Sequence, residues 1–337
     1  MNFLKGFLVG SVSLLIVACG SGGDGFNVNS GISYNGVTTP ATITGDNAED
    51  IATGAYQNGN SPEGMDFGGF ALVQDSQGAP ITHSRNLVLS EALVKVISQI
   101  DFSSVSNDVA ISAVETENYS EPGNCGGNMS VNSRVDDVSG EVNGTIIFND
   151  YCEDGTTLSG SINISGTIDG GPGEPSEFTI SFTTLTVVSD GDSFTVNGSI
   201  SFNFDDFYIM TLTINMYVRD NIEGKVYWVS NYELSITTVS SGYYSYLYDV
   251  DIEVSGDFYD PDYGLAVLST SEHLHIYSGD ENPSSGVLIV TGATGIAGGS
   301  TKARLTALSS TTYKVEADTN GDGAYNWDSG IQYWSEL

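Results

Sequence analysis

The stretch DTNGDGAYNWD, from Asp318 to Asp328, carries oxygen-bearing side chains at alternate positions in its first half. Alternate oxygen ligands followed by a glycine at the sharp turn are how a calcium loop of the EF-hand type begins, and Gly323 supplies that glycine. The residue after the glycine would contribute its backbone carbonyl. The candidate calcium ligands are therefore Asp318, Asn320, Asp322, Ala324 and Asp328.

The residues around this stretch do not fit an EF-hand. The twelfth position should be a bidentate Glu, but Ser329 stands there and Asp328 comes one residue early. An EF-hand also needs a helix on both sides, whereas residues 311–317 alternate between polar and apolar like a strand. Asn-Gly and Asp-Gly pairs are strong signals for a hairpin turn. The sequence thus predicts a β-hairpin whose tip is a candidate calcium site.

The pair His273 and His275 is the second feature with metal-binding chemistry. The two histidines alternate with Leu274 and Ile276, so a strand would place both imidazoles on one face. Imidazoles at this spacing can hold a transition metal, and Glu272 is the nearest carboxylate in sequence. The sequence identifies no third ligand, and the two histidines equally suit the polar face of a strand.

Enzyme signatures are missing from the sequence. There is no G-x-S-x-G nucleophile elbow, no H-E-x-x-H and no lysine after a phosphate-binding glycine loop. Gly292, Gly295 and Gly298 form a glycine string that we interpret as a mobile loop. A tyrosine cluster could line a sugar or lipid site or simply fill strand positions: Tyr243, Tyr244, Tyr246 and Tyr248. We therefore expect a non-enzymatic protein.

Composition narrows the class of partner. Against 43 acidic residues the chain has 9 basic ones, which gives a formal net charge of −34. Proteins bind nucleic acids and anionic lipid head groups through Lys and Arg side chains that neutralise the phosphates. Because the chain has so few of these residues, we expect no nucleic-acid partner. A hydrophobic content of 39% is enough for a folded core in a chain of 337 residues.

The N-terminal residues have the pattern of an export signal. Lys5 precedes an apolar run that is too short to span a bilayer as an anchor, and residues 1–18 are predicted to be a signal peptide. The tetrapeptide Ile16-Val17-Ala18-Cys19 resembles a bacterial lipobox. This resemblance implies cleavage before Cys19 and acylation of it, with chains such as palmitate anchoring the protein in the membrane. Gly20 favours the outer membrane of the cell envelope, and the Gly- and Ser-rich residues 19–31 would form a flexible tether.

Two cysteines remain after the lipobox. Cys125 and Cys152 form an even pair in an exported chain, where the compartment is oxidising. We predict a disulfide between them. The alternative, two reduced thiols or half of a metal site, lacks C-x-x-C spacing.

Residues 32–337 are predicted to form a single domain that is mainly β (α+β). Apolar residues at helical spacing indicate helices within residues 45–100, the clearer one over residues 84–100. From about residue 108 the period changes to two, which is typical of antiparallel strands. Strands are expected at 142–148, 158–168, 178–182, 194–204, 212–218, 225–239, 243–256, 264–277, 286–291, 302–308 and 311–317. We expect a large curved antiparallel meander sheet or half-barrel, with one or two N-terminal helices on its concave face.

This architecture resembles the half-barrels that carry lipoproteins. The chain is also similar to uncharacterised exported bacterial lipoproteins. The similarity lies in the sequence segment Tyr34–Ile43, in the predicted helix that ends at Ala55-Tyr56 and in the D-x-N-G-D-G-x-Y stretch. Neither resemblance brings an established activity with it. The expected function is a lipid-anchored envelope protein with a binding or structural role and an unidentified protein or ligand partner. A carrier of an apolar ligand is the first alternative and a polysaccharide hydrolase is the second.

Overall fold

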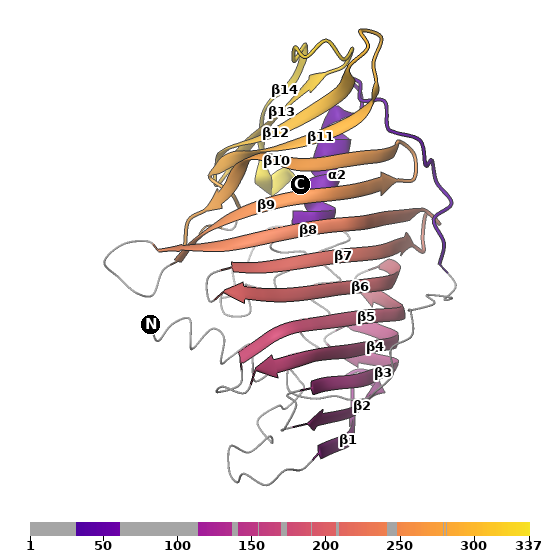
Figure 1. The fold of residues 1–337 in the computed structure, drawn as a ribbon. Helices are drawn as coiled ribbons and strands as arrows, with labels where there is room; N and C mark the ends of the chain where they lie inside the picture. Colours follow the sequence, from indigo (N-terminus) through magenta and orange to yellow (C-terminus); the bar gives the residue numbers. More distant parts are fainter. Residues whose placement is uncertain are drawn as a thin grey trace. The chain divides into compact units, whose positions relative to one another are not determined.

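The computed structural model describes residues 32–60, 114–136, 141–153, 155–169, 174–189, 191–206, 209–240, 248–278, 280 and 282–337. Fourteen strands form one antiparallel meander sheet, in which each strand pairs with the next along the chain (Figure 1). The predicted mainly β class is confirmed. The signal peptide 1–18, Cys19, the tether 19–31 and the second helix at 84–100 lie outside the described residues.

The described residues form one α-helix, one short 3-10 helix and the fourteen strands of the sheet. The helix α2 spans Ala48–Asn60, and a short 3-10 helix, η2, spans Trp334–Glu336. The strands are β1 (Val114–Pro122), β2 (Gly126–Asp136), β3 (Glu141–Glu153), β4 (Thr156–Asp169), β5 (Glu174–Ser189), β6 (Asp192–Asp206), β7 (Ile209–Asp220), β8 (Val226–Ser240), β9 (Tyr248–Asp260), β10 (Gly264–Ile276), β11 (Ser285–Thr294), β12 (Ser300–Ser309), β13 (Thr312–Asp318) and β14 (Trp327–Tyr333).

The described residues belong to two compact units. The first holds β1 to β6 and the last residues of β7, Val218–Asp220. The second holds the segment from Ser33, the rest of β7 and strands β8 to β14. In both units apolar residues at alternate strand positions are buried, as Phe148, Ile162 and Val315 are, because one face of each strand meets the core.

The predicted disulfide is confirmed in the first unit. Cys125, in the turn between β1 and β2, bonds to Cys152 near the end of β3, with the Cα atoms 5.1 Å apart. The Cys125 backbone N–H also donates to the Cys152 carbonyl across 3.1 Å. The bond therefore ties the tip of the first hairpin to the third strand.

Glycines in the first unit face bulges in neighbouring strands. Gly160 on β4 has a φ of +128°, and a Cβ there would come within 2.4 Å of the Thr184 carbonyl oxygen. Thr184 itself has a φ of +51°, at a shift in the β5 register. Gly198 on β6, with a φ of +139°, faces the same bulge from the other side. The sequence Gly-Ser-Ile begins at Gly160 on β4 and again at Gly198 on β6. The bulge between these two strands gives a physical reason for the glycine in both places.

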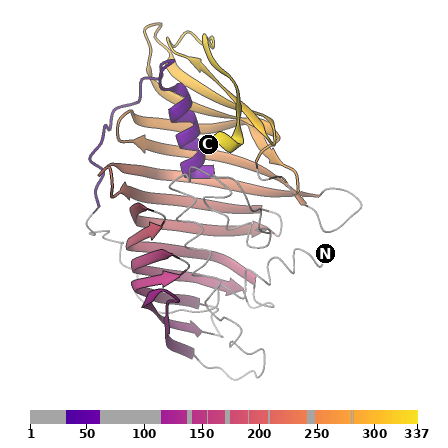
Figure 2. The ribbon, with the colours of Figure 1, turned by 180° about the vertical axis from the view of Figure 1, so that it is seen from behind.

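The helix α2 covers part of one face of the second unit. It contacts strands β8 to β13, and Figure 2 shows it lying across these strands beside η2. Ile51, Ala52 and Ala55 are at most 1% exposed, so the helix backbone approaches the sheet closely. Burying a side chain of the size of Ile51 contributes about 2 kcal/mol. Among the described residues no helix is long and apolar enough to cross a membrane.

Candidate functional site: the Asp318 loop and the His273–His275 face

The C-terminal stretch forms the predicted hairpin. Strands β13 and β14 pair antiparallel, with Ala317 opposite Trp327. Gly321 and Gly323 have φ values of +78° and +89°. Left-handed backbone of this kind favours glycine, which explains why the turn contains both an Asn-Gly and an Asp-Gly pair.

Asp318 is the centre of this loop, at the end of β13, and it is only 2% exposed. Its Oδ1 accepts the backbone N–H groups of Gly321 (2.7 Å) and Asn320 (3.3 Å), and its Oδ2 accepts that of Gly323 (2.8 Å). Burial by itself would raise the pKa of Asp318, but these amide donors more than offset it and hold the pKa below its ordinary value. The loop thus wraps around a stabilised carboxylate.

The next candidate ligands meet at the exposed tip. The Asp322 N–H donates to Asn320 Oδ1 (3.0 Å), while Asn320 Nδ2 donates to Asp322 Oδ2 (3.1 Å). The Ala324 N–H donates to Asp322 Oδ1 at 2.8 Å. Asp318, Asn320, Asp322 and Ala324 therefore belong to one continuous hydrogen-bonded turn.

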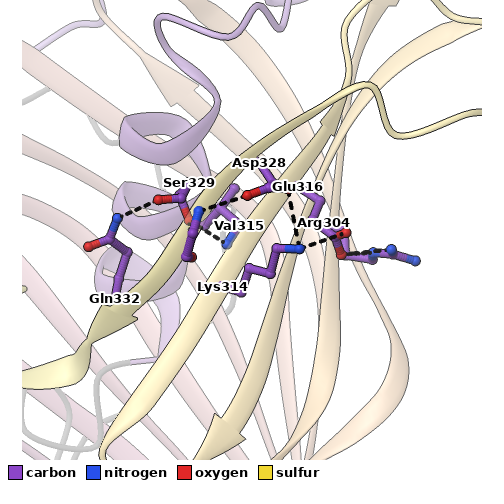
Figure 3. A network of polar contacts seen from close by, with 8 residues as sticks. Arg304, Lys314, Val315, Glu316, Asp328, Ser329 and Gln332 are labelled. Atoms are coloured by element: carbon purple, nitrogen blue, oxygen red, sulfur yellow. Dashed lines mark hydrogen bonds and ion pairs between the residues drawn. The ribbon is translucent and has the colours of Figure 1, made fainter.

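Asp328, the fifth candidate ligand, makes different contacts. It lies on β14, where its Oδ1 accepts the Gly330 N–H at 2.9 Å. Its Oδ2 is 3.5 Å from the Lys314 ammonium on β13 (Figure 3). Ser329, at the twelfth loop position, accepts the Val315 N–H through its hydroxyl at 3.0 Å. Both residues thus engage strand β13.

An ion-pair network extends from Asp328 across three strands (Figure 3). Arg304 on β12 donates through Nε (3.0 Å) and one terminal nitrogen (2.7 Å) to Glu316, and Lys314 reaches the same carboxylate at 3.2 Å. Burial by itself would raise the pKa of Glu316, but these donors hold it below its ordinary value. The hydrogen bond that Lys314 donates to Glu316 is the main reason why the pKa of Lys314 is raised. Sequence reasoning missed this network, since only the strand register brings Arg304 opposite Glu316.

The glycine string packs against the Asp318 loop. The Ala297 N–H donates to the Asn320 carbonyl (2.9 Å), and the Gly299 N–H donates to the Gly321 carbonyl (3.1 Å). A Cβ at Gly295 would come within 2.3 Å of the Asn320 carbonyl oxygen. The string therefore has a packing role, which its interpretation as a mobile loop did not include.

His273 and His275 lie on the outward face of β10, as their alternation predicted. Each is paired with a carboxylate of β9: His273 Nε2 lies 2.6 Å from Glu253 Oε1, and His275 Nδ1 lies 2.6 Å from Asp251 Oδ1. Sequence reasoning named Glu272, which sits at a shift in the β10 register. The two β9 partners could have been found from the alternation of acids in D-V-D-I-E once β9 and β10 were aligned.

Four aromatic rings form a row in the second unit that the sequence did not predict. Trp228 stacks on Tyr259 with centroids 4.1 Å apart and on Tyr217 at 5.5 Å, and Tyr34 meets Tyr259 edge-on. Tyr217, Trp228 and Tyr259 thus stack face to face, and Tyr34 packs against Tyr259 at an angle. Of the predicted tyrosine cluster, Tyr248 begins β9, and Tyr243, Tyr244 and Tyr246 lie outside the described residues.

Together the fold and the site define the chain as an antiparallel meander-sheet protein with a carboxylate-centred C-terminal hairpin. Comparison of the chain with protein-family models, curated proteins and solved structures found no match.

Proposed function

We propose that the chain is an exported lipoprotein, anchored in the cell envelope, most favourably the outer membrane, through acyl groups on Cys19. The observation that carries this proposal is the sequence Ile16-Val17-Ala18-Cys19 directly after a charged start and an apolar run. The disulfide between Cys125 and Cys152 supports export, since such bonds persist in oxidising compartments.

The β-sheet domain has a non-enzymatic, structural or binding role in this proposal. Asp220 and Asp318 are the buried carboxylates of the described residues, and both accept backbone N–H groups of the turns that follow them. Groups used in this way stabilise turns. These contacts support a structural role for the two carboxylates better than a catalytic one.

The contact between α2 and the sheet also favours this role over that of an apolar-ligand carrier. Tyr56 on α2 lies 5.1 Å from Trp334, and Trp334 lies 4.6 Å from Tyr313 on β13, measured between ring centroids. Ala48, Ala52 and Ala55 are fully buried on the same helix. The chain's own side chains thus fill the described helix–sheet contact.

Metabolic labelling tests the anchor. The chain is expressed in a bacterium with a lipoprotein export pathway, grown with an alkyne analogue of palmitate, and the purified protein is coupled to a fluorophore. We expect label and membrane fractionation for the wild type, and neither for Cys19→Ser. The double variant Cys125→Ser/Cys152→Ser is the matched control, because it removes two cysteines but should keep the label. A labelled Cys19→Ser protein would overturn the proposal.

A further inference from the structure

Strands β9 and β10 place two histidine–carboxylate pairs next to each other on one outward face. In the strand register Leu274 pairs with Ile252 and His275 with Asp251. His273 lies where this register shifts, and its side chain reaches Glu253. Leu274 and Ile252 point into the core. The four polar side chains therefore share the opposite face, as a two-by-two group across neighbouring strands.

Each carboxylate determines which ring nitrogen of its histidine carries the hydrogen. At 2.6 Å, His273 Nε2 and His275 Nδ1 are the nitrogens that donate to Glu253 and Asp251. In a neutral imidazole the other nitrogen then carries a lone pair. The lone pairs are therefore on His273 Nδ1 and His275 Nε2. A carboxylate on the far nitrogen is the usual outer partner of a metal-binding histidine, because it orients the ring and raises its basicity.

Other contacts fix the His275 ring and the backbone at His273. The ring of Tyr277 packs edge-on against His275, with centroids 4.5 Å apart. The register of β10 shifts between Glu272 and His275, opposite Gly286 on β11. A Cβ at Gly286 would come within 2.3 Å of the His273 carbonyl oxygen, so this bulge requires a glycine partner. Bulges of this kind re-aim side chains and recur beside functional sites.

We propose that His273 and His275 bind one divalent transition-metal ion, with Glu253 and Asp251 as positioning residues. Alternate residues of a strand are about 6.6 Å apart, a span that two imidazoles can bridge with metal–nitrogen bonds of about 2.1 Å. Imidazole ligands select Zn²⁺, Ni²⁺ or Cu²⁺ over the hard cation Ca²⁺. The net charge of −34 concentrates cations at the surface. Water completes the coordination shell.

Zinc and copper titrations test this site on the tag-free full chain purified in detergent. Calorimetry against a competing chelator should show one zinc ion bound per chain, and His273→Ala/His275→Ala should abolish that binding. Asp251→Asn should weaken zinc binding about 10- to 100-fold, as loss of an outer carboxylate does. Electron paramagnetic resonance of the copper-loaded protein should show coupling to two imidazole nitrogens in the wild type and to one in His273→Ala.

The chain offers two matched controls. His83→Ala removes the third histidine, and Glu121→Ala removes an exposed carboxylate of β1; neither should change zinc affinity or the copper spectrum. Far-ultraviolet circular dichroism of each variant checks that the fold is kept. Equal zinc binding by the wild type and the folded double-histidine variant would overturn the proposal, and so would a copper spectrum without nitrogen coupling.

Discussion

The carboxylate of Asp318 accepts the backbone N–H of Gly323 at 2.8 Å, five residues further along the chain. The same side chain accepts the N–H groups of Asn320 and Gly321, so one buried side chain organises the whole turn after β13. The glycine string lies against the outside of this turn, through Gly299 and the Gly321 carbonyl. The end of the sheet therefore depends on a single carboxylate.

Replacing Asp318 should destabilise the protein more than replacing Asp322, the exposed carboxylate of the same loop. Asp318→Ala leaves three backbone N–H groups without their acceptor, and we expect the free energy of unfolding to fall by about 3 kcal/mol. Urea denaturation followed by tryptophan fluorescence measures this, since Trp327 lies next to the loop. Asp322→Ala is the control, because that side chain is exposed and should change stability by about 0.5 kcal/mol. Equal effects of the two variants would contradict the central role of Asp318.

The ionised carboxylate of Asp318 should also make the free energy of unfolding depend on pH in the acidic range. The pKa of Asp318 is lower in the folded chain than its ordinary value of 3.8, so the folded state favours the ionised form. Its contribution is therefore complete above the ordinary pKa and is lost as the pH falls through the lower, folded pKa. The stability difference between wild type and Asp318→Asn should be constant near neutral pH and shrink below about pH 4. A difference that grew on acidification would contradict this assignment.

Most of the fold could be predicted from the sequence, because alternation of polar and apolar residues reports directly on a sheet with one buried face. Strands β3, β4, β6 to β8 and β10 to β13 all begin or end close to their predicted positions, whereas β5 is longer than predicted at both ends. Strands β1 and β2 were not assigned. The sequence of β1, VETENYSEP, has few apolar residues to alternate. The hairpin at Asp318 was predicted because Asn-Gly and Asp-Gly turns are local signals.

The partners of the site residues could not be predicted in the same way. Asp251 is 24 residues from His275 in sequence and Glu253 is 20 residues from His273, and only the pairing of β9 with β10 brings them together. Arg304 and Glu316 meet for the same reason. A one-residue error in register would move each side chain to the opposite face, so alternation alone cannot pair them.

Gly160 should be far more sensitive to substitution than Gly126. Both have a strongly positive φ, +128° and +142°, but a Cβ at Gly160 would meet the Thr184 carbonyl at 2.4 Å whereas a Cβ at Gly126 meets nothing within 4 Å. Gly126→Ala then reports backbone strain alone, about 1 to 3 kcal/mol. Gly160→Ala should lose about 2 kcal/mol more, because the bulge must also move. Thermal unfolding of the two variants compares them; equal losses would show that the close approach to Thr184 is unimportant.

The disulfide should stabilise the first unit because it lowers the conformational entropy of the unfolded chain. Cys125 and Cys152 are 27 residues apart, and the chain-entropy relation for a loop of this length gives about 3.5 kcal/mol. Urea denaturation of the wild type and of Cys125→Ser/Cys152→Ser measures the difference. Hydrogen exchange should quicken mainly in β1 to β3, which the bond ties together. A uniform increase across β8 to β13 would contradict this local effect.

The Glu316 network should contribute modestly and depend on salt. Glu316→Gln removes the charge that Arg304 and Lys314 both contact, and we expect a loss of about 1 kcal/mol because the group is partly exposed. The folded pKa of Glu316 is lowered, so its contribution is present above its ordinary value of 4.5 and is lost as the pH falls. The loss should diminish in about 1 M sodium chloride. Arg304→Lys keeps the charge but removes the two-point hydrogen bond, and should lose part of the same amount.

Calcium binding at the C-terminal loop should be weak and should depend on Asp322. The Asp318 oxygens already accept three N–H groups, and Asp328 faces Lys314, so the exposed Asp322 and the half-buried Asn320 supply the oxygens of the tip. We expect half-saturation at millimolar calcium, typical of sites with few charged ligands. A tenfold excess of free calcium over the Kd should then raise the free energy of unfolding by about 1.4 kcal/mol.

Asp322→Ala should abolish this calcium-dependent stabilisation, whereas Asp328→Asn should leave it unchanged. Thermal unfolding in calcium and in magnesium separates specific binding from general screening, because magnesium demands an octahedral shell that the tip lacks. Loss of the effect in Asp328→Asn would show that Asp328 turns from Lys314 to the ion and that the loop closes as a larger calcium site. Retention of the effect in Asp322→Ala would place the bound calcium elsewhere on the acidic surface.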